Sequence, residues 1–548
     1  MGGITTGPST RRSDLDALRG FAMLLGIALH AGLSFTSVWW PVQDTQQNEL
    51  FGLFFSAIHG FRMPLFFLLS GFFTAMLWRQ RGLRSLLSHR LRRVLLPLLL
   101  GLVTVVPAVS FISGIALTSG TGVDEAETAK NDIWSAAAAG QLEEIKQYLA
   151  GGADPNALDS AFGTSPLAWA ALHGQTAAAE LLLQQGAEVN RQTRDDGTAL
   201  HAAAFLGRTE TAALLIEHGA DAQIRNTSGM TPRQSSAVDW ELTLYILALL
   251  KIELDEDEAK AGRLEIADLL GGIESQGANS AASLSDRLVQ STSIPIFSSP
   301  VFHHLWFLWF LCWLVVAFAA YAAVADRLKW QGPRKWLLLS PARFLWLIPL
   351  SMVPQWFMGL TMPGFGPDTS IGILPMPQVL LYYAIFFGFG ALYFDCDDRQ
   401  ATLGKSWRWM LPLGLFVVFP LGLEFSLGSF GFREALLPPS MTRPFAVALQ
   451  VIYAWIMAFA CMGLFRTFFV GENKSIRYMS DASYWLYVVH LPLVMGAQWA
   501  VRAWPLWPIV KFTLICLLVT GFLLLTYQTI VRYSWLGKLL NGPRARPE

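Results

Sequence analysis

The sequence predicts an all-α, polytopic membrane protein with an inserted domain of helical repeats. Of its 548 residues, 53% are hydrophobic and only 15% are charged, whereas soluble domains carry about 25% charged residues. Ten apolar stretches are long enough to cross a bilayer, and a segment between the third and fourth of them repeats with a period near 33 residues. This composition excludes ordinary soluble domains and a disordered chain, and the four Cys are too few for a disulfide scaffold.

The ten apolar stretches approach or exceed the roughly 20 residues that a membrane-spanning helix needs. The weakest are the fifth, which contains Pro349 and Pro354, and the seventh, which contains Pro412 and Pro420. The predicted spans are 17–37, 50–77, 94–118, 304–325, 341–360, 377–395, 408–428, 445–467, 483–503 and 508–531.

The charges of the connecting loops predict the orientation of these spans. The loop at 78–93 holds six Arg, whereas the loops around 43–49 and 361–375 hold no Lys or Arg. Positive and neutral loops alternate in this way along the chain, so the positive-inside rule places both termini in the cytoplasm of a multi-pass inner-membrane protein. The insert between the third and fourth spans is then extracytoplasmic. The first span is expected to be a retained anchor because it is too long for a signal peptide.

We therefore expect four regions: a first membrane part at 1–118, an insert with linker at 119–300, a second membrane part at 301–535 and a cytoplasmic tail at 536–548. The net charge of zero conceals the acidity of the insert, since residues 119–303 hold 26 Asp and Glu against 11 Lys and Arg. The basic residues of the remainder flank apolar stretches, and this placement argues against nucleic-acid binding.

The insert repeats two glycine registers. Gly140, Gly174 and Gly207 are 34 and 33 residues apart, and so are the glycines of GGADPN, QGAEVN and HGADAQ. This period and residue pattern resemble ankyrin repeats over 131–237. The segment GRLEIADLL at 262–270 is similar to the second helix of one more repeat. His201 occupies the His position of the ankyrin tetrapeptide, here TALH, where we expect a structural role. The concave surface of such a stack, with Trp169, is a candidate for binding a protein or a polymeric substrate.

Ionisable side chains within the spans are the candidates for chemistry, because burying them in a membrane is costly. Arg19 and His30 are 11 residues apart, which places them on nearly the same face of a helix about 16 Å apart. A neutral imidazole there is suited to accept a proton from a hydroxyl, and an Arg near the cytoplasmic side is suited to bind phosphate or carboxylate. The structural alternative pairs Arg19 with Asp16 and satisfies His30 by a neighbouring helix.

The second span contains Arg62 inside its apolar run, so this side chain needs a counter-charge or a bound anion. His59 precedes it, and Ser70 with Gly71 allows close helix approach. The alternative is a packing helix with one buried ion pair.

Three further polar positions complete the set. His304 begins the fourth span, where an interfacial anchor is the alternative, and His490 lies inside the ninth. Glu424 is a lone acid in the seventh span and a candidate partner for Arg62 or a His. The sequence has no HExxH, Walker or GxSxG motif, so it predicts neither a metal site nor ATP or serine-esterase chemistry.

Five segments in order, LDALRGFAMLLGIALHA, FRMPLFFLLSGFF, HRLRRVLLPLLLG, HLWFLWFL and SYWLYVVHLPLV, resemble the membrane-bound acyltransferase 3 family. They are most similar to its glucan biosynthesis protein C branch, which is linked to succinyl transfer onto periplasmic glucans. The resemblance covers about 11–118 and 300–540 and implies ten spans, no bound cofactor, a cytoplasmic acyl-CoA co-substrate and a hydroxyl acceptor outside. The family's Arg and His motif falls on Arg19 and His30. The ankyrin insert departs from the family layout.

The resulting hypothesis is an O-acyltransferase that moves an acetyl- or succinyl-type group from acyl-CoA to an extracytoplasmic glycan. His30 and Arg19 are the expected catalytic residues, and membrane lipid surrounds the protein. The expected substrate-binding residues are Arg62, His59, Ser70, Arg90, Arg92, Arg93, His304 and His490. Two alternatives remain open: a transporter or flippase for an anionic substrate, and a membrane-anchored ankyrin scaffold.

Overall fold

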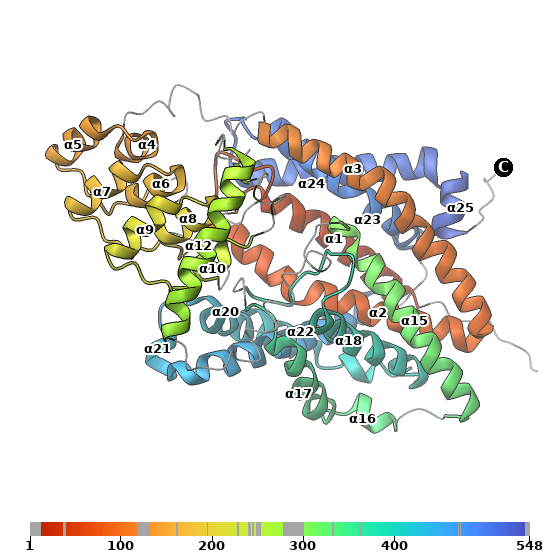
Figure 1. Cartoon of the computed structure of the whole chain (residues 1–548). Coiled ribbons are helices and arrows are strands. Elements are labelled where there is room, and N and C mark those ends of the chain that lie inside the picture. Colours follow the sequence, from red (N-terminus) through yellow and green to blue (C-terminus); the bar gives the residue numbers. More distant parts are fainter. Residues whose placement is uncertain are drawn as a thin grey trace, which may run out of the picture. The chain divides into compact units, whose positions relative to one another are not determined.

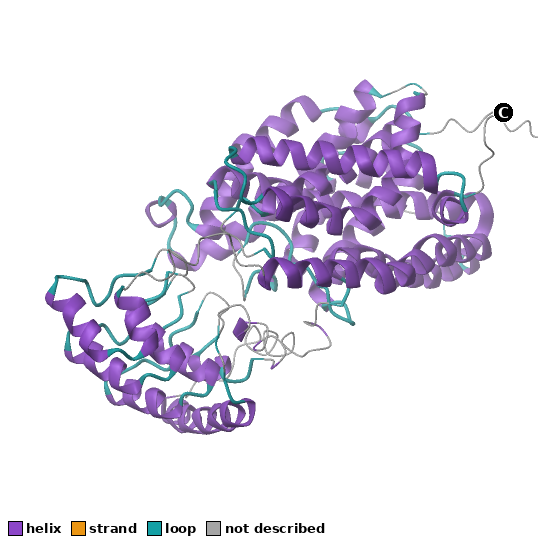
Figure 2. Ribbon diagram, turned by 90° about the horizontal axis from the view of Figure 1, so that it is seen from above, coloured by secondary structure: helices purple, strands orange, loops and turns teal. Residues whose placement is uncertain are grey.

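The structure is a computed structural model that describes residues 12–36, 40–118, 132–159, 163–193, 196–226, 230–238, 240, 243, 246–247, 252, 254–277, 297, 301–330, 334–360, 364–469, 471 and 473–542. Its described elements are all helical, which confirms the predicted class (Figure 2). The chain divides into two compact units: one comprises 1–122, 292–358 and 364–548, and the other comprises 123–291 with 359–363. The predicted domain boundaries at 118 and 300 fall beside or within residues outside the described part.

The first unit is a bundle of long apolar helices (Figure 1). Its elements are α1 Ser13–Leu33, α2 Glu49–Arg90, η1 Leu91–Leu95, α3 Leu96–Thr118, η2 His303–Leu305, α15 Trp306–Arg327, α16 Lys335–Leu339, α17 Arg343–Trp356, α18 Pro377–Asp395, η3 Thr402–Gly404, α19 Trp407–Leu413, η4 Gly414–Val418, α20 Phe419–Leu427, α21 Arg433–Leu436, α22 Pro439–Phe468, α23 Lys474–Val501, α24 Pro508–Thr526, η5 Tyr527–Val531 and α25 Trp535–Asn541.

Each of the ten predicted spans corresponds to helix in this unit, although only seven described segments are long and apolar enough to cross a membrane by length and composition. One of the seven, Glu49–Ala116, includes both α2 and α3. The chain runs out along the first part of α2 and back along α3, and Gly82, inside α2, interrupts the helix with φ 76° and ψ 169° (Figure 1). The helix α17 has only 14 residues, and α23 is also absent from the seven. The protein is therefore a multi-pass membrane protein, and the count of ten stays a prediction.

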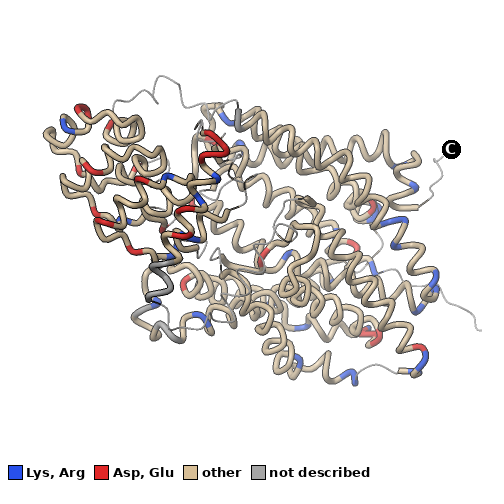
Figure 3. The backbone as a smooth tube through the Cα atoms, viewed as in Figure 1, with Lys and Arg blue, Asp and Glu red and all other residues tan. Residues whose placement is uncertain are grey.

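Close helix packing in this unit depends on glycine. A Cβ on Gly71 of α2 would lie 1.9 Å from the carbonyl oxygen of Phe387 on α18, and a Cβ on Gly390 of α18 would lie 1.9 Å from that of Leu68. The two backbones are therefore in direct contact, the arrangement that small residues permit inside membranes. Lys and Arg lie mainly at the ends of the helices (Figure 3).

The second unit is a stack of helix pairs whose caps repeat along the sequence. The first helices begin after Asp132, Ser165, Thr198 and Thr231, each a favourable N-cap residue. The elements are α4 Ile133–Ala139, α5 Leu142–Ala150, α6 Pro166–His173, α7 Thr176–Gln184, α8 Ala199–Leu206, α9 Thr209–Glu217, α10 Pro232–Ser235 and α12 Glu256–Gly277.

The repeated glycines end the first helices of this stack. Gly140, Gly174 and Gly207 adopt φ values of 69°, 70° and 71°, a left-handed conformation that glycine enters without a steric penalty. His201 is structural, as expected, because its Nδ1 accepts the Thr198 N–H at 3.1 Å and its Nε2 contacts the Met230 carbonyl at 2.9 Å. The helix predicted at 262–270 lies within α12, which packs on α8, α9 and α10.

Candidate active site

The helices α1 and α23 pack side by side and are joined at two levels. Near their N-terminal ends, the Arg19 guanidinium donates to the Ser480 carbonyl at 3.0 Å and to its hydroxyl at 2.6 Å. Further along, His30 Nδ1 lies 3.0 Å from His490 Nε2. The two levels are 11 residues apart on α1 and 10 on α23, or about 15–16 Å along each helix axis. The helices therefore run parallel and in register, and Arg19 and His30 both face α23.

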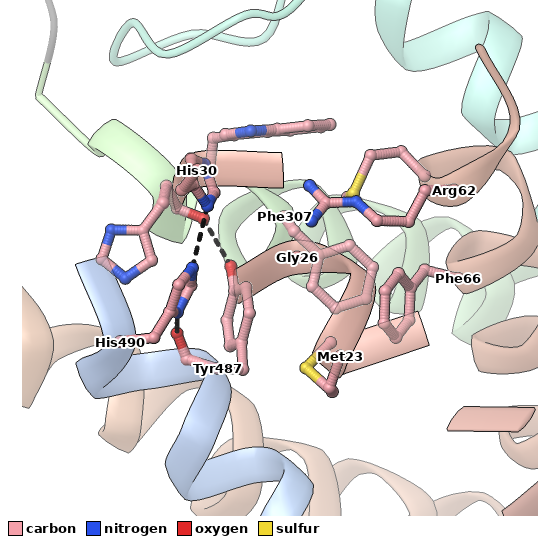
Figure 4. A pocket seen from close by; sticks show the side chains of 11 residues that line it. Met23, Gly26, His30, Arg62, Phe66, Phe307, Tyr487 and His490 are labelled. Atoms are coloured by element: carbon pink, nitrogen blue, oxygen red, sulfur yellow. Dashed lines mark hydrogen bonds between the residues drawn. The ribbon is translucent and has the colours of Figure 1, made fainter. Parts of the chain in front are cut away.

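A cavity of about 40 Å³ opens beside His30, at the level of the His30–His490 contact (Figure 4). By the usual allowance for one water, this volume holds about three. Residues from α1, α2, η2, α15 and α23 line it: Met23, Gly26, His30, Arg62, Met63, Phe66, His304, Trp306, Phe307, Tyr487 and His490. Of the ten predicted site residues, His30, Arg62, His304 and His490 thus meet at one cavity, although they are far apart in the sequence.

The hydrogen bonds assign a proton position to each imidazole. His490 Nδ1 lies 2.8 Å from the Tyr487 carbonyl and 3.1 Å from the Leu486 carbonyl. Because carbonyl oxygens only accept, Nδ1 of a neutral His490 carries the hydrogen and its Nε2 is an acceptor. His30 Nδ1–H is then the donor to that Nε2, so the remaining nitrogen of a neutral His30, Nε2, is the one that can accept a proton.

His304 presents a second acceptor to the same cavity. Its Nε2–H donates to the Val488 carbonyl at 3.0 Å, so Nδ1 of the neutral ring is unprotonated. This Nδ1 is buried and has no partner among the described residues. The His304 and His490 rings meet edge to face, with centroids 5.1 Å apart. The predicted alternative of an interfacial anchor does not describe a ring that is 8% exposed and lines a cavity.

Arg62 is the cationic group of the cavity. Figure 4 shows its guanidinium reaching in from α2 toward Gly26 of α1. A Cβ added at Gly26 would come within 2.5 Å of Nη1, so the glycine makes room for this side chain. The guanidinium forms no hydrogen bond or ion pair with any residue in the described part of the chain, and its Nε is buried. The cavity therefore combines two imidazole acceptors with one cation that has no counter-ion among the residues the structure describes.

The predicted pairing of Glu424 with Arg62 or a His is wrong. The Glu424 carboxylate is fully buried and accepts the backbone N–H groups of Phe430, Phe432 and Arg433 at 2.6, 2.6 and 2.5 Å. These three donors follow the end of α20, so the acid stabilises the turn that leaves its own helix.

Two predicted site residues of α2 lie away from the cavity lining. The His59 Nε2–H donates to the Pro367 carbonyl at 3.0 Å, and the ring stacks on Phe55. The Ser70 carbonyl accepts the Thr74 hydroxyl at 2.6 Å. His59 therefore anchors the loop that carries Pro367, and Ser70 lies on α2 outside the lining of the cavity.

The remaining predicted arginines belong to the end of the bundle where Arg19 contacts Ser480. Arg90 donates to the Thr74 hydroxyl at 2.6 Å and lies close enough to Arg19 and Arg93 for their charges to interact. Arg19 also lies 3.6 Å from Asp16, the contact named in the structural alternative. Arg92 is exposed on η1. Clustered guanidinium groups of this kind are suited to bind phosphate.

Sequence reasoning missed three residues around His30. The Tyr487 hydroxyl donates to the His304 carbonyl at 2.7 Å, and the ring lines the cavity. Gln498 and Trp40 contact His30 from α23 and from the loop after α1. A signal was present for the first two, because Tyr487 and Gln498 lie about one and two helical turns from His490 in the same apolar run. Nothing local marks Trp40 among the other tryptophans.

Comparisons with known proteins match two parts of the chain. Residues 12–136 and 266–528 match an acyltransferase domain, the acyltransferase 3 type, and residues 133–226 match ankyrin repeats in three copies. Glucans biosynthesis protein C of Shigella dysenteriae is 39% identical over 92 residues, and that of Escherichia coli K12 is 38% identical over the same length. This alignment spans 17% of the present chain and 24% of each relative.

Proposed function

The chain belongs to the acyltransferase 3 family, and we propose that it transfers an acetyl- or succinyl-type group from cytoplasmic acyl-CoA to a hydroxyl of an extracytoplasmic glycan. The observation that carries this proposal is the 3.0 Å contact of His30 Nδ1 with His490 Nε2, which leaves His30 Nε2 as the proton acceptor, beside Arg62 at one cavity. A proton acceptor and a cation at one small site are the groups that acyl transfer to a hydroxyl requires.

In the proposed mechanism, His30 Nε2 removes the proton of the acceptor hydroxyl as its oxygen attacks the thioester carbonyl. The new imidazolium keeps its Nδ1–H bond to His490 Nε2, and this bond favours the charged form. Arg62 stabilises the oxyanion of the tetrahedral intermediate. Collapse of that intermediate breaks the carbon–sulfur bond, and the leaving thiolate takes the proton from His30 Nε2. The ester and free CoA are the products, and no proton is gained or lost overall.

We place the phosphates of the donor at Arg19, Arg90 and Arg93, with Arg92 nearby on η1. The levels of Arg19 and His30 are about 16 Å apart along α1, so an extended donor is needed to engage both at once. A thioester at the end of a flexible arm meets that requirement. His304, through its free Nδ1, is proposed to accept a hydrogen bond from the acceptor substrate.

The decisive test replaces His30 by Ala and by Gln in the full-length protein in proteoliposomes. Transfer of labelled acyl groups from acyl-CoA to a glucan should be abolished in both variants, while the amount of protein in the membrane stays unchanged. The control is His218→Ala, which removes an exposed repeat-unit imidazole. Parental turnover in either His30 variant would refute the mechanism. Movement of an unmodified anion across the membrane would instead support a transporter.

The location of both termini, the inner-membrane residence and the extracytoplasmic side of the insert are part of this proposal. A Gln184→Cys variant in a Cys-free background tests the side of the insert, because this α7 side chain is exposed. A membrane-impermeant maleimide should label it in intact cells, like an outer-loop control at Thr369. Protection of Gln184→Cys alone would place the repeats beside the donor and favour a regulatory or scaffold role for them.

A further inference from the structure

The carbonyl groups in the last turn of α1 need hydrogen-bond donors from elsewhere, because the last four carbonyls of a helix have no intrahelical N–H partner. The Gly32 and Leu33 carbonyls accept the backbone N–H groups of Phe35 and Thr36. The His30 and Ala31 carbonyls are instead satisfied from another helix, by the Gln498 amide nitrogen at 2.9 and 3.2 Å. The backbone of His30 is thus tied to α23 eight residues beyond His490.

The other end of the same amide holds an aromatic ring against His30. Gln498 Oε1 accepts the Trp40 indole N–H at 2.9 Å, and the Trp40 ring stacks on the His30 ring with centroids 6.1 Å apart and planes inclined by 27°. Two carbonyl acceptors on the nitrogen and an N–H donor on the oxygen determine the amide orientation uniquely. Gln498 is 1% exposed, so these bonds are shielded from water.

The loop that carries Trp40 is itself anchored. The Ser34 hydroxyl donates to the Val42 carbonyl at 2.6 Å. Lys511 of α24 contacts both carboxylate oxygens of Asp44 at 2.9 Å, and the two side chains are 0% and 1% exposed. Removing one partner of a buried pair with this geometry strongly destabilises a protein, so the pair holds Asp44, four residues after Trp40, against α24.

We propose that Gln498 is a positioning residue, which acts through Trp40 and the end of α1 to hold the His30 imidazole in place for proton transfer. His30 is then restrained in three ways: at its carbonyl by Gln498, at its ring face by Trp40 and at Nδ1 by His490. Gln498 and Trp40 do not line the cavity, so they act on the imidazole and not on the substrate. This inference rests on the proposed role of His30 as the base.

The test compares Gln498→Leu, Trp40→Phe and the double variant in the full-length protein. Gln498→Leu removes all three hydrogen bonds, and we expect kcat to fall about 100-fold, the loss that follows a displacement near 1 Å, with KM for acyl-CoA unchanged. Trp40→Phe keeps the stacked ring and loses one bond, so kcat should fall about fivefold. The double variant should be no slower than Gln498→Leu, because the two residues act as one unit.

Gln450→Leu is the matched control. Gln450 is also a buried amide with several hydrogen bonds, to Gln355, Gly366 and Ser426, but it lies on α22 away from the cavity. Its kcat should stay near the parental value even if thermal stability falls. Equal losses of kcat in Gln450→Leu and Gln498→Leu, or a Gln498→Leu effect on KM alone, would overturn the inference.

The His30→Ala variant separates the two proposals. If His30→Ala is inactive while both Gln498→Leu and Trp40→Phe turn over at the parental rate, the positioning role is wrong and the base stands. If His30→Ala is active, the proposed function itself fails. Should Gln498→Leu not accumulate in the membrane, Trp40→Phe decides, since a phenyl ring retains the stack and an unchanged kcat contradicts the role.

Discussion

Replacing Arg62 by Leu should remove activity without removing stability. The guanidinium has no hydrogen-bond or ion-pair partner among the described residues, although it belongs to a helix within the membrane. An Arg at the centre of a spanning helix costs about 2.5–3.5 kcal/mol on insertion scales. Arg62 is half-buried at the cavity wall, so only part of this free energy is recovered in the variant. The midpoint of thermal unfolding should therefore stay the same or rise.

The same substitution of Arg62 should lower kcat, although it does not lower stability. A group that stabilises a developing oxyanion contributes about 100- to 1,000-fold to kcat. Arg62→Leu should lose that factor in acyl transfer, while Arg62→Lys should retain part of it, because an ammonium supplies the charge without the fork of donors. Purified variants in detergent give both numbers, with thermal unfolding followed by tryptophan fluorescence and turnover followed by release of free CoA.

Lys511→Leu provides the contrast, because it breaks a buried ion pair with Asp44. Removing one partner of such a pair typically destabilises a protein by about 3–5 kcal/mol, so this variant should unfold at a clearly lower temperature. If Arg62→Leu is destabilised as strongly as Lys511→Leu, the guanidinium has a structural counter-charge. The argument for an anion-binding cavity would then be refuted.

Three further predictions follow from the packing and charges. Gly71→Leu should prevent accumulation of folded protein in the membrane, because the new side chain would force α2 and α18 apart and cost more than about 4 kcal/mol of folding free energy. The control is Gly52→Ala on the same helix, where an added Cβ meets no atom within 4 Å, and this variant should accumulate normally. Arg263→Met in the repeat unit leaves the carbonyls of residues 205 and 238 without their donor, and we expect about 2–3 kcal/mol less stability in denaturant-dependent proteolysis of the repeats. His173 is held neutral because burial, and then the charge of Arg208, lower its pKa. The unfolded chain therefore binds more protons below pH 6.5, so the repeats should become more susceptible to protease as the pH falls from 7 to 5, and His173→Gln should weaken that dependence.

Much of the fold was predictable because its causes are local. A run of about 20 apolar residues must be helical in a membrane wherever it packs. The 33-residue register places an N-cap residue and a left-handed glycine at the same points of the first three repeats. The spacing of Arg19 and His30 likewise follows from the helix period alone. These features would be the same in any arrangement of the helices.

Which residues form the site was less predictable, because helix packing determines the contacts of polar groups inside a membrane. His59 is an ionisable side chain on the same span as Arg62, yet the structure directs it to a loop carbonyl. Glu424 was expected to find a cation and instead binds three backbone N–H groups that follow its own helix. Every residue except proline carries a backbone N–H donor, so the residue types in the sequence do not indicate which donors a buried acid will contact.

The sequence by itself determined the membrane class, the repeat insert, the family and the presence of a His and an Arg on one face of the first span. Only the tertiary structure decided that His490, 460 residues away, lies with its Nε2 3.0 Å from His30 Nδ1, a contact that assigns the hydrogen to Nδ1 and the lone pair to Nε2 of His30. The physical reason is that a tautomer depends on which acceptors surround a ring in space. Those acceptors are the carbonyls of a helix turn that α23 brings beside α1, and no local pattern encodes that contact.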